Sequence, residues 1–219
     1  SVSVPVLSSA TRVTVPSRSS ATADLISTPC RPAVAIGAAS AGDVRAAVRY
    51  AAEHDLPIAV SSTGHGQARP ADGAVLINLR RMNGIEIDPD AGTATVGPGT
   101  ELQDLVDAAA KHGLAPLAGS SPNVGVVGYA LGGGLSSTLG RTYGWAADHV
   151  RSFELVTADG TVRRVGPETE PDLFWAVRGG KGNFGVVTSL TIGLVPVTRL
   201  YGGGLFFDGA DARPVLDAF

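Results

Sequence analysis

Cysteine is almost absent from this chain, which holds only Cys30 among its 219 residues. A single thiol excludes an intrachain disulfide and any zinc site built from several cysteines, because each of these needs at least two. The four histidines stand at unrelated spacings, and the H-E-x-x-H motif of zinc hydrolases does not occur. We therefore expect no metal site.

Basic charge and long hydrophobic runs are also scarce. The formal net charge is -3, and no run of Lys or Arg is interleaved with aromatic residues, so we expect no nucleic-acid partner. No segment approaches the roughly 18 apolar residues of a membrane span, and we expect no membrane association. Residues 1–25 lack the basic and apolar regions of a signal peptide, which predicts a cytoplasmic protein.

Glycine is abundant instead, and two helices are predicted among the glycine-rich turns. The chain has 29 glycines, 14 prolines and 44% hydrophobic residues, a composition typical of a compact α/β protein. Residues 40–54 carry apolar side chains at helical spacing behind Ser40 as the N-cap. Residues 100–112 repeat this pattern, with Thr100 and Gln103 as a predicted capping box and Gly113 as the C-terminal stop.

Strands are predicted between these helices and in the chain that follows them. A strand is predicted at residues 56–60 and a buried strand at 74–79, and the β-branched segment 185–192 is typical of a central strand. The other predicted strands form a hairpin over 85–96, a hairpin over 153–165 that turns at Asp159-Gly160, and a strand over 201–207. A helix is expected to begin at Asp211.

Three segments are dense in glycine: 61–67 (SSTGHGQ), 119–134 (GSSPNVGVVGYALGGG) and 178–185 (RGGKGNFG). Glycine allows a backbone to approach a ligand closely, so that successive N–H groups converge on an anion such as a pyrophosphate. Neither the G-x-G-x-x-G fingerprint nor the P-loop pattern is present. Each segment alone could equally serve tight turns or helix packing, but three in one chain favour a large, extended ligand.

The histidines separate into structural and functional candidates. His54 and His112 fall in last helical turns, where a cation suits the helix dipole, and His149 is interpreted as a polar edge residue. Only His65 lies within a glycine loop. No G-x-S-x-G elbow occurs, so no hydrolase constellation is present.

The three glycine-rich segments, read with three further motifs, resemble the FAD-binding domain of the vanillyl-alcohol oxidase / p-cresol methylhydroxylase (PCMH) superfamily. The motifs are YGWAAD at 143–148, VTADG at 156–160 and DLFWAVRGGKGNFGVVT at 172–188. The resemblance covers residues 31–196 and is strongest to the berberine-bridge-enzyme-like oxidoreductases. It implies an α+β fold of the PCMH type, with two α/β subdomains, mixed or antiparallel sheets and flanking helices.

The resemblance also implies a domain division. Residues 1–30 would be a poorly patterned arm, and residues 31–197 the FAD-binding domain, divided into subdomains 31–80 and 81–197. Residues 198–219 would begin a truncated substrate domain. In the family the catalytic base comes from a later segment, so we assign no catalytic residue.

The resemblance assigns FAD to the glycine-rich segments, with the loop 61–67 around its pyrophosphate and a ring nitrogen of His65 bonded to the 8α carbon of the flavin. Ser61 and Thr63 replace the Arg and Gly of the commonest family loop. Ser121 stands where doubly linked members have a cysteine, so a single link is expected. The implied cofactor-binding residues are Ser61, Ser62, Thr63, Gly64, His65, Gly66, Gln67, Ser121, Val124, Gly125, Gly128, Tyr129, Gly132, Gly133, Gly134, Tyr143, Asp148, Gly185, Val186 and Val187.

The function that the resemblance implies is that of an FAD-dependent oxidoreductase, either an oxidase or a dehydrogenase. A small-molecule substrate would lose a hydride from a C–O or C–N carbon to the flavin, and O2 or another acceptor would reoxidise it. Two alternatives stay open: a module that binds FAD without turnover of its own, and a flavoprotein of the same fold with a non-redox reaction.

Overall fold

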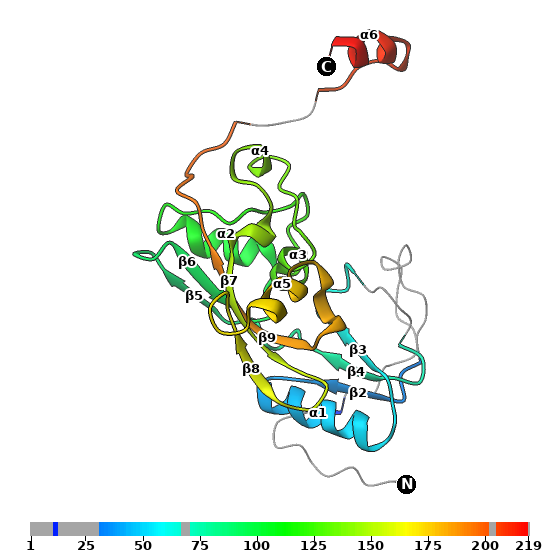
Figure 1. The fold of residues 1–219 in the computed structure, drawn as a ribbon. Coiled ribbons are helices and arrows are strands. Elements are labelled where there is room, and N and C mark those ends of the chain that lie inside the picture. Colours follow the sequence, from blue (N-terminus) through cyan, green and yellow to red (C-terminus); the bar gives the residue numbers. More distant parts are fainter. Residues whose placement is uncertain (1–10, 13–30, 67–70, 202–204, 219) are drawn as a thin grey trace.

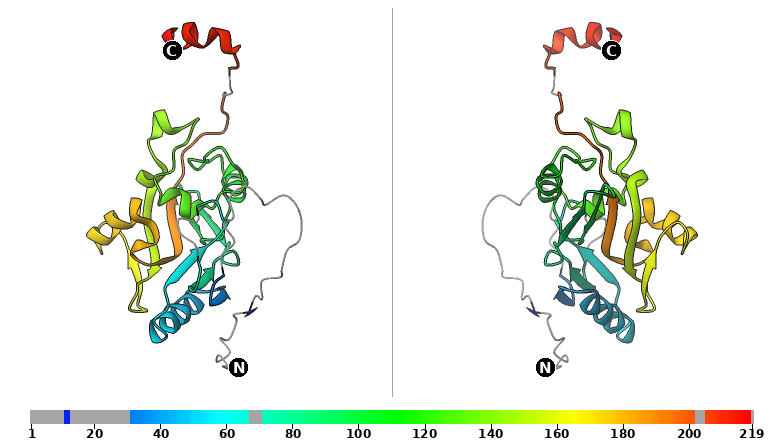
Figure 2. Two further views of the ribbon diagram at one scale, coloured as in Figure 1. Left: turned by 90° about the vertical axis from the view of Figure 1, so that its right-hand side faces the viewer. Right: turned by 90° about the vertical axis from the view of Figure 1, so that its left-hand side faces the viewer.

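A computed structural model describes residues 11–12, 31–66, 71–201 and 205–218 of the chain. Within these residues, two β-sheets and their helices form one α+β body, as expected for the fold class. A short C-terminal helix stands away from this body in all three views (Figures 1 and 2).

The first sheet has the strand order β1-β2-β4-β3. Strands β2, β4 and β3 run parallel, and the two-residue β1 pairs antiparallel with β2 at one edge. The predicted strands 56–60 and 74–79 correspond to β3 and β4, whereas β2 had not been predicted. The strands are β1 (Thr11–Arg12), β2 (Val34–Gly37), β3 (Ile58–Ser61) and β4 (Val75–Asn78).

Helix α1 (Ala41–Glu53) packs between the two sheets. The Ser40 hydroxyl accepts a hydrogen bond from the Asp43 amide at 3.2 Å, which confirms Ser40 as the N-cap. The predicted apolar face of α1 is buried in a cluster with Ile77 of the first sheet and Val156 and Val186 of the second. The helix therefore joins the two sheets through their apolar faces.

The second sheet is antiparallel throughout, with the order β5-β6-β9-β7-β8. Strand β9 lies in the middle, which confirms the central strand predicted at 185–192. Both predicted hairpins are present as β5–β6 and β7–β8. The strands are β5 (Ile85–Asp88), β6 (Thr93–Val96), β7 (Val150–Val156), β8 (Val162–Val165) and β9 (Val186–Gly193).

Four α-helices and two 3₁₀ turns of the described chain accompany this sheet. Three of the helices and one turn contribute buried residues to the apolar cluster on its strands, whereas the fourth helix and the other turn bury none. Of these, only α2 was predicted. They are α2 (Leu102–Ala110), α3 (Val126–Ala130), α4 (Gly140–Tyr143), α5 (Pro171–Gly180), η1 (Ala146–His149) and η2 (Lys181–Asn183).

The capping box predicted for α2 is wrong. The N-cap is Glu101, whose side chain makes no capping bond, and the buried Thr100 hydroxyl instead donates to the Gly84 carbonyl at 3.3 Å. The Gln103 amide donates to the Pro122 carbonyl, so a neighbouring loop satisfies the helix start. Gly113 has φ +69° and follows the last turn, which confirms its role as the stop.

The strand predicted over 201–207 is also wrong for Leu205–Phe207, which the structure describes as irregular and exposed. No described strand lies beside this segment, and an isolated strand has nothing to pair with. The helix expected from Asp211 is present as α6 (Ala212–Ala218), preceded by the 3₁₀ turn η3 (Gly209–Asp211). Of the predicted arm 1–30, only Thr11 and Arg12 are among the described residues.

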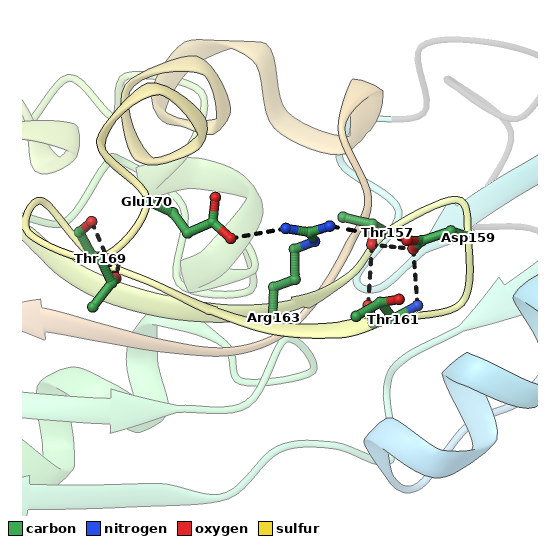
Figure 3. Close-up of polar contacts among 7 residues, drawn as sticks. Thr157, Asp159, Thr161, Arg163, Thr169 and Glu170 are labelled. Carbon is green, nitrogen blue, oxygen red and sulfur yellow. Dashed lines mark hydrogen bonds and ion pairs between the residues drawn. The ribbon is translucent and has the colours of Figure 1, made fainter.

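The β7–β8 turn is held by a group of polar side chains (Figure 3). The Asp159 carboxylate accepts hydrogen bonds from the Thr157 hydroxyl at 2.5 Å and the Thr161 amide at 3.0 Å. Arg163 lies 4.0 Å from the same carboxylate and pairs more closely, at 2.9 Å, with Glu170. The bond from Thr157 is the largest of the effects that lower the pKa of Asp159 to about 2.

We predict that Asp159→Asn makes the free energy of unfolding less dependent on pH under acid conditions. Because the folded chain lowers this pKa from 3.8, the stabilisation is complete above about pH 4 and is lost as the pH falls toward 2. The urea midpoint of the parent should exceed that of the variant at the upper end of this pH range, and the difference should shrink as the pH falls. Thr157→Val should weaken the same dependence, and parallel profiles for parent and Asp159→Asn would contradict the prediction.

Candidate functional site

The first glycine-rich segment leaves the first sheet at the carboxyl end of β3. The Ser61 carbonyl accepts a hydrogen bond from the Leu79 amide at 2.8 Å, which fixes the start of the loop beside the end of β4. The Ser62 hydroxyl donates to the Pro98 carbonyl at 2.6 Å, and Arg80 Nε donates to the Ser62 carbonyl at 3.2 Å. The loop is thus anchored to residues that lead into both sheets.

Thr63 joins this loop to the second glycine-rich segment. The Gly125 amide donates to the Thr63 hydroxyl at 3.1 Å. A Cβ atom at Gly125 would lie only 3.2 Å from that oxygen and 3.4 Å from the Thr63 methyl group. Glycine at 125 therefore lets the two segments approach each other.

The third glycine-rich segment meets the second at the end of α5. The helix loses its regular geometry at Arg178 and Gly179, and the Gly179 amide donates to the Leu131 carbonyl at 2.8 Å. The end of the Lys181 side chain rests on Gly132, where an added Cβ would lie 2.3 Å from Lys181 Cε. All three segments therefore come together, although they are far apart in the sequence.

An open depression of about 360 Å³ lies where the second and third segments meet. It includes six of the predicted cofactor-binding residues: Ser121, Val124, Gly128, Tyr129, Gly132 and Gly134. Four further lining residues were not assigned from the sequence. Three of them lie inside the glycine-rich segments 119–134 and 178–185, and Leu135 directly follows the first of these. The four are Gly119, Ser120, Leu135 and Lys181.

The depression contains a buried hydroxyl without a hydrogen-bond partner and a stretch of backbone that no side chain covers. The Tyr129 hydroxyl is buried and has no hydrogen-bond partner among the described residues, and burial raises the pKa of Tyr129. A buried hydroxyl without a partner is unfavourable, so it is suited to an acceptor on a ligand. An added Cβ at Gly128 would meet nothing within 4 Å, which leaves the helix backbone open to close approach.

His65 follows the contact at Thr63 by two residues. Its side chain is exposed, and its ring makes no hydrogen bond to the described part of the chain. Gly64 before it has φ +90°, a conformation that favours glycine. Gly66 is also exposed, and Gln67, the last predicted residue of this loop, lies outside the described residues.

Three predicted residues, Gly133, Tyr143 and Asp148, do not line the depression but build the turn beside it. The Asp148 carboxylate accepts from the Trp145 amide at 3.0 Å, and the Tyr143 carbonyl lies 2.8 Å from His149 Nε2. The Gly133 carbonyl accepts from the Ala147 amide at 2.9 Å. In this structure these residues hold the glycine segment in place.

Gly185, Val186 and Val187 form the entry to β9. A Cβ at Gly185 would lie 2.5 Å from the Val156 carbonyl oxygen, so the pairing with β7 itself requires glycine there. The ladder between β9 and β6 begins only at Leu190. On that side, no described strand pairs with residues 186–189, which leaves their backbone groups available for other partners.

Two negative findings apply to the residues that the structure describes. They contain no group of three or more His, Cys, Asp or Glu side chains arranged to hold a metal ion. Their helices are all too short or too polar to cross a membrane.

Glycine-rich segments that converge around an open depression define a protein that binds a large nucleotide-like cofactor. Comparison with known families makes this specific, because residues 32–166 match the family model described as FAD binding domain. The match spans more than half of the chain, and the chain belongs to this family.

Several relatives are oxidases. The chain is 44% identical over 171 residues to (R)-6-hydroxynicotine oxidase of Paenarthrobacter nicotinovorans, covering 77% of this chain and 37% of that protein. The solved xylooligosaccharide oxidase of Myceliophthora thermophila is 32% identical, with a TM-score of 0.72 over 77% of this chain and 36% of its own. The chain thus spans well under half the length of these relatives.

A berberine-bridge-enzyme-like protein is among the solved neighbours. The variant D396N of Physcomitrella patens BBE-like 1 is 28% identical, with a TM-score of 0.72 over 76% of this chain and 37% of that chain. These neighbours confirm the resemblance to the PCMH-type superfamily and the fold that it implied.

We predict that Thr63→Val lowers the free energy of unfolding by about 1–2 kcal/mol, because the Gly125 amide loses its acceptor while side-chain volume is kept. Thr63→Ser retains the hydroxyl and is the matched control. Urea denaturation of the three proteins measures the effect. Equal midpoints for the Val and Ser variants would show that the hydrogen bond contributes nothing.

We predict that Tyr129→Phe weakens FAD binding without destabilising the fold. Without FAD the variant should be at least as stable as the parent, because it removes a buried hydroxyl that has no partner. With saturating FAD its melting temperature should rise less than that of the parent, because the acceptor on the ligand loses its donor. The same rise for both proteins would exclude a contact between this hydroxyl and FAD.

Proposed function

We propose that this chain is the FAD-binding part of an FAD-dependent oxidoreductase that oxidises a C–O or C–N carbon of a small molecule. One observation carries the proposal: the second and third glycine-rich segments line a depression with an unsatisfied buried hydroxyl, and the first segment is bonded to the second, in a chain of the FAD binding domain family. The oxidase names of the relatives support the reaction class. The chain spans only 37% of the first relative, and the activity is therefore part of what we propose.

The cofactor, when bound, would supply the hydride acceptor of the reaction. The chain's own residues bind and orient it. The anchored loop at Ser62 and Thr63 presents backbone groups and hydroxyls, Gly128 leaves α3 open to close contact, and Tyr129 supplies a hydrogen-bond donor. We further propose that the free backbone edge at Val186 and Val187 binds the adenine end.

The domain division predicted from the resemblance is part of the proposal. The three parallel strands of the first sheet lie within residues 31–80, and every strand of the second sheet lies within 81–197. The exposed apolar side chains of Leu205 and Phe206, and the position of α6 away from the two sheets (Figure 2), support the assignment of 198–219 to a following substrate domain. Its residues would include the catalytic base.

A binding module without turnover of its own is the second candidate. It rests on the family match, whose description names FAD binding and no reaction. A substrate panel distinguishes the two candidates, because an oxidoreductase loses its yellow colour on substrate addition whereas a binding module does not. The small-molecule substrate, the acceptor O2 and the cytoplasmic location stay predictions.

The single covalent link through His65 is proposed on the chemistry of the loop. A neutral imidazole has one ring nitrogen with a free lone pair, so His65 would hold the flavin through that nitrogen when FAD is bound. The exposed ring of His65 has no described hydrogen-bond partner that would occupy that lone pair. Ser121, which lines the depression, offers no thiol for a second link.

We predict that flavin fluorescence stays with the polypeptide after acid precipitation and gel electrophoresis, and is lost from that band in His65→Ala. The reason is that the variant lacks the nucleophile but keeps the rest of the loop. His54→Ala, which removes a histidine at the end of α1, is the matched control and should keep the fluorescence. Flavin released from the parent into the acid supernatant would exclude the link while leaving non-covalent FAD binding intact.

A further inference from the structure

Lys181 stands out in the third glycine-rich segment. The chain has only two lysines, and this one lies between Gly180 and Gly182. Its backbone has φ 51° and ψ -131°, a conformation that glycine adopts readily and that residues with a side chain rarely adopt. Such strain persists only where the surrounding structure imposes it, and it is concentrated at functional sites.

The surroundings of Lys181 impose this conformation from both sides. The Asn183 side-chain amide donates to the Gly180 carbonyl at 2.8 Å and closes the turn. The Phe184 ring lies so close to Gly180 that a Cβ there would be 2.4 Å from it. On the other side, the bond from Gly179 to Leu131 fixes the end of α5. The lysine is therefore held where its side chain reaches the second glycine-rich segment.

The Lys181 side chain lies over the depression. A Cβ at Gly132 would be 2.3 Å from Lys181 Cε and 2.6 Å from Nζ, so a side chain at 132 would displace the end of the lysine. Lys181 is the one charged residue that lines the depression. Within the described chain it makes no ion pair or hydrogen bond. The depression thus has a single cation without an anionic partner.

The chemistry of this cation selects one part of FAD. A lysine ammonium is a compact point charge that binds phosphate oxygens through charge-assisted hydrogen bonds. The two phosphates of FAD are its only anionic groups in the oxidised state, because the oxidised ring system is neutral. We propose that Lys181 binds the diphosphate of FAD, an inference that rests on the proposed function.

This role makes Lys181 a determinant of cofactor specificity. The lysine distinguishes FAD from flavins without phosphate, because riboflavin offers the ring system but no anion. The glycine-rich backbone offers N–H groups to the same diphosphate, whereas the Tyr129 hydroxyl serves an uncharged part of the ligand. Lys181 adds the one charged side chain that lines the depression.

The test compares FAD with riboflavin in the full 219-residue chain carrying His65→Ala, so that no covalent link forms and binding is reversible. Lys181→Met keeps the length and backbone strain of the side chain but removes the charge. We expect the FAD dissociation constant, from quenching of flavin fluorescence, to rise about tenfold or more. The riboflavin dissociation constant should change less than about twofold, because riboflavin has no phosphate for Lys181 to bind.

The control is Lys111→Met, which removes the only other lysine, at the end of α2, and should leave both constants unchanged. Lys181→Gly is a second variant that relieves the positive φ; it should keep the parent's melting temperature and still bind FAD weakly. Added salt should weaken FAD binding by the parent more steeply than by Lys181→Met, since the lost contact is ionic.

The possible results distinguish a failure of the Lys181 contact from a failure of the proposed function. Equal FAD affinity of the parent and Lys181→Met would overturn the phosphate contact and leave FAD binding standing. Equal losses for FAD and riboflavin would also overturn it, because the cation would then act on the ring system. If the parent itself binds no FAD, the proposed function fails, and this inference fails with it.

Discussion

The close approach of three glycine-rich segments depends on a few backbone contacts that only glycine permits. The hydrogen bond from the Gly125 amide to the Thr63 hydroxyl joins segments separated by 62 positions in the sequence. The bond from Gly179 to Leu131 adds the third segment. Because a Cβ at Gly125 would press on Thr63, a larger residue there would force the first and second segments apart.

The two sheets serve this convergence in different ways. Strands β3 and β4 end beside each other and present the loop that carries His65, whereas the first residues of the central strand β9 are unpaired on the side of β6. Helix α1 packs between the sheets and fixes them relative to each other. The depression itself is lined mostly by uncharged groups, so a single lysine dominates its electrostatics even though the net charge of the chain is -3.

Prediction from the sequence succeeded where local pattern and tertiary structure agree. Ser40 caps α1 as its position before an amphipathic run indicates, and β9 is central as its β-branched composition indicates. Prediction failed where a distant partner decides. Thr100 looked like a cap, but its hydroxyl bonds the Gly84 carbonyl, and Leu205–Phe207 looked like a strand but have no neighbouring strand. Helix α5 was missed although its Pro171 at the first turn signals a helix start.

The sequence by itself determined which segments carry the backbone freedom to surround a cofactor, because glycine and turn residues act through local sterics. It also carried the motifs that identify the family and the candidate residue His65. Only the tertiary structure decided that Asp148 closes a supporting turn, that the Tyr129 hydroxyl is buried without a partner, and that Lys181 reaches Gly132. These facts depend on contacts between residues remote in sequence, which spacing along the chain does not encode.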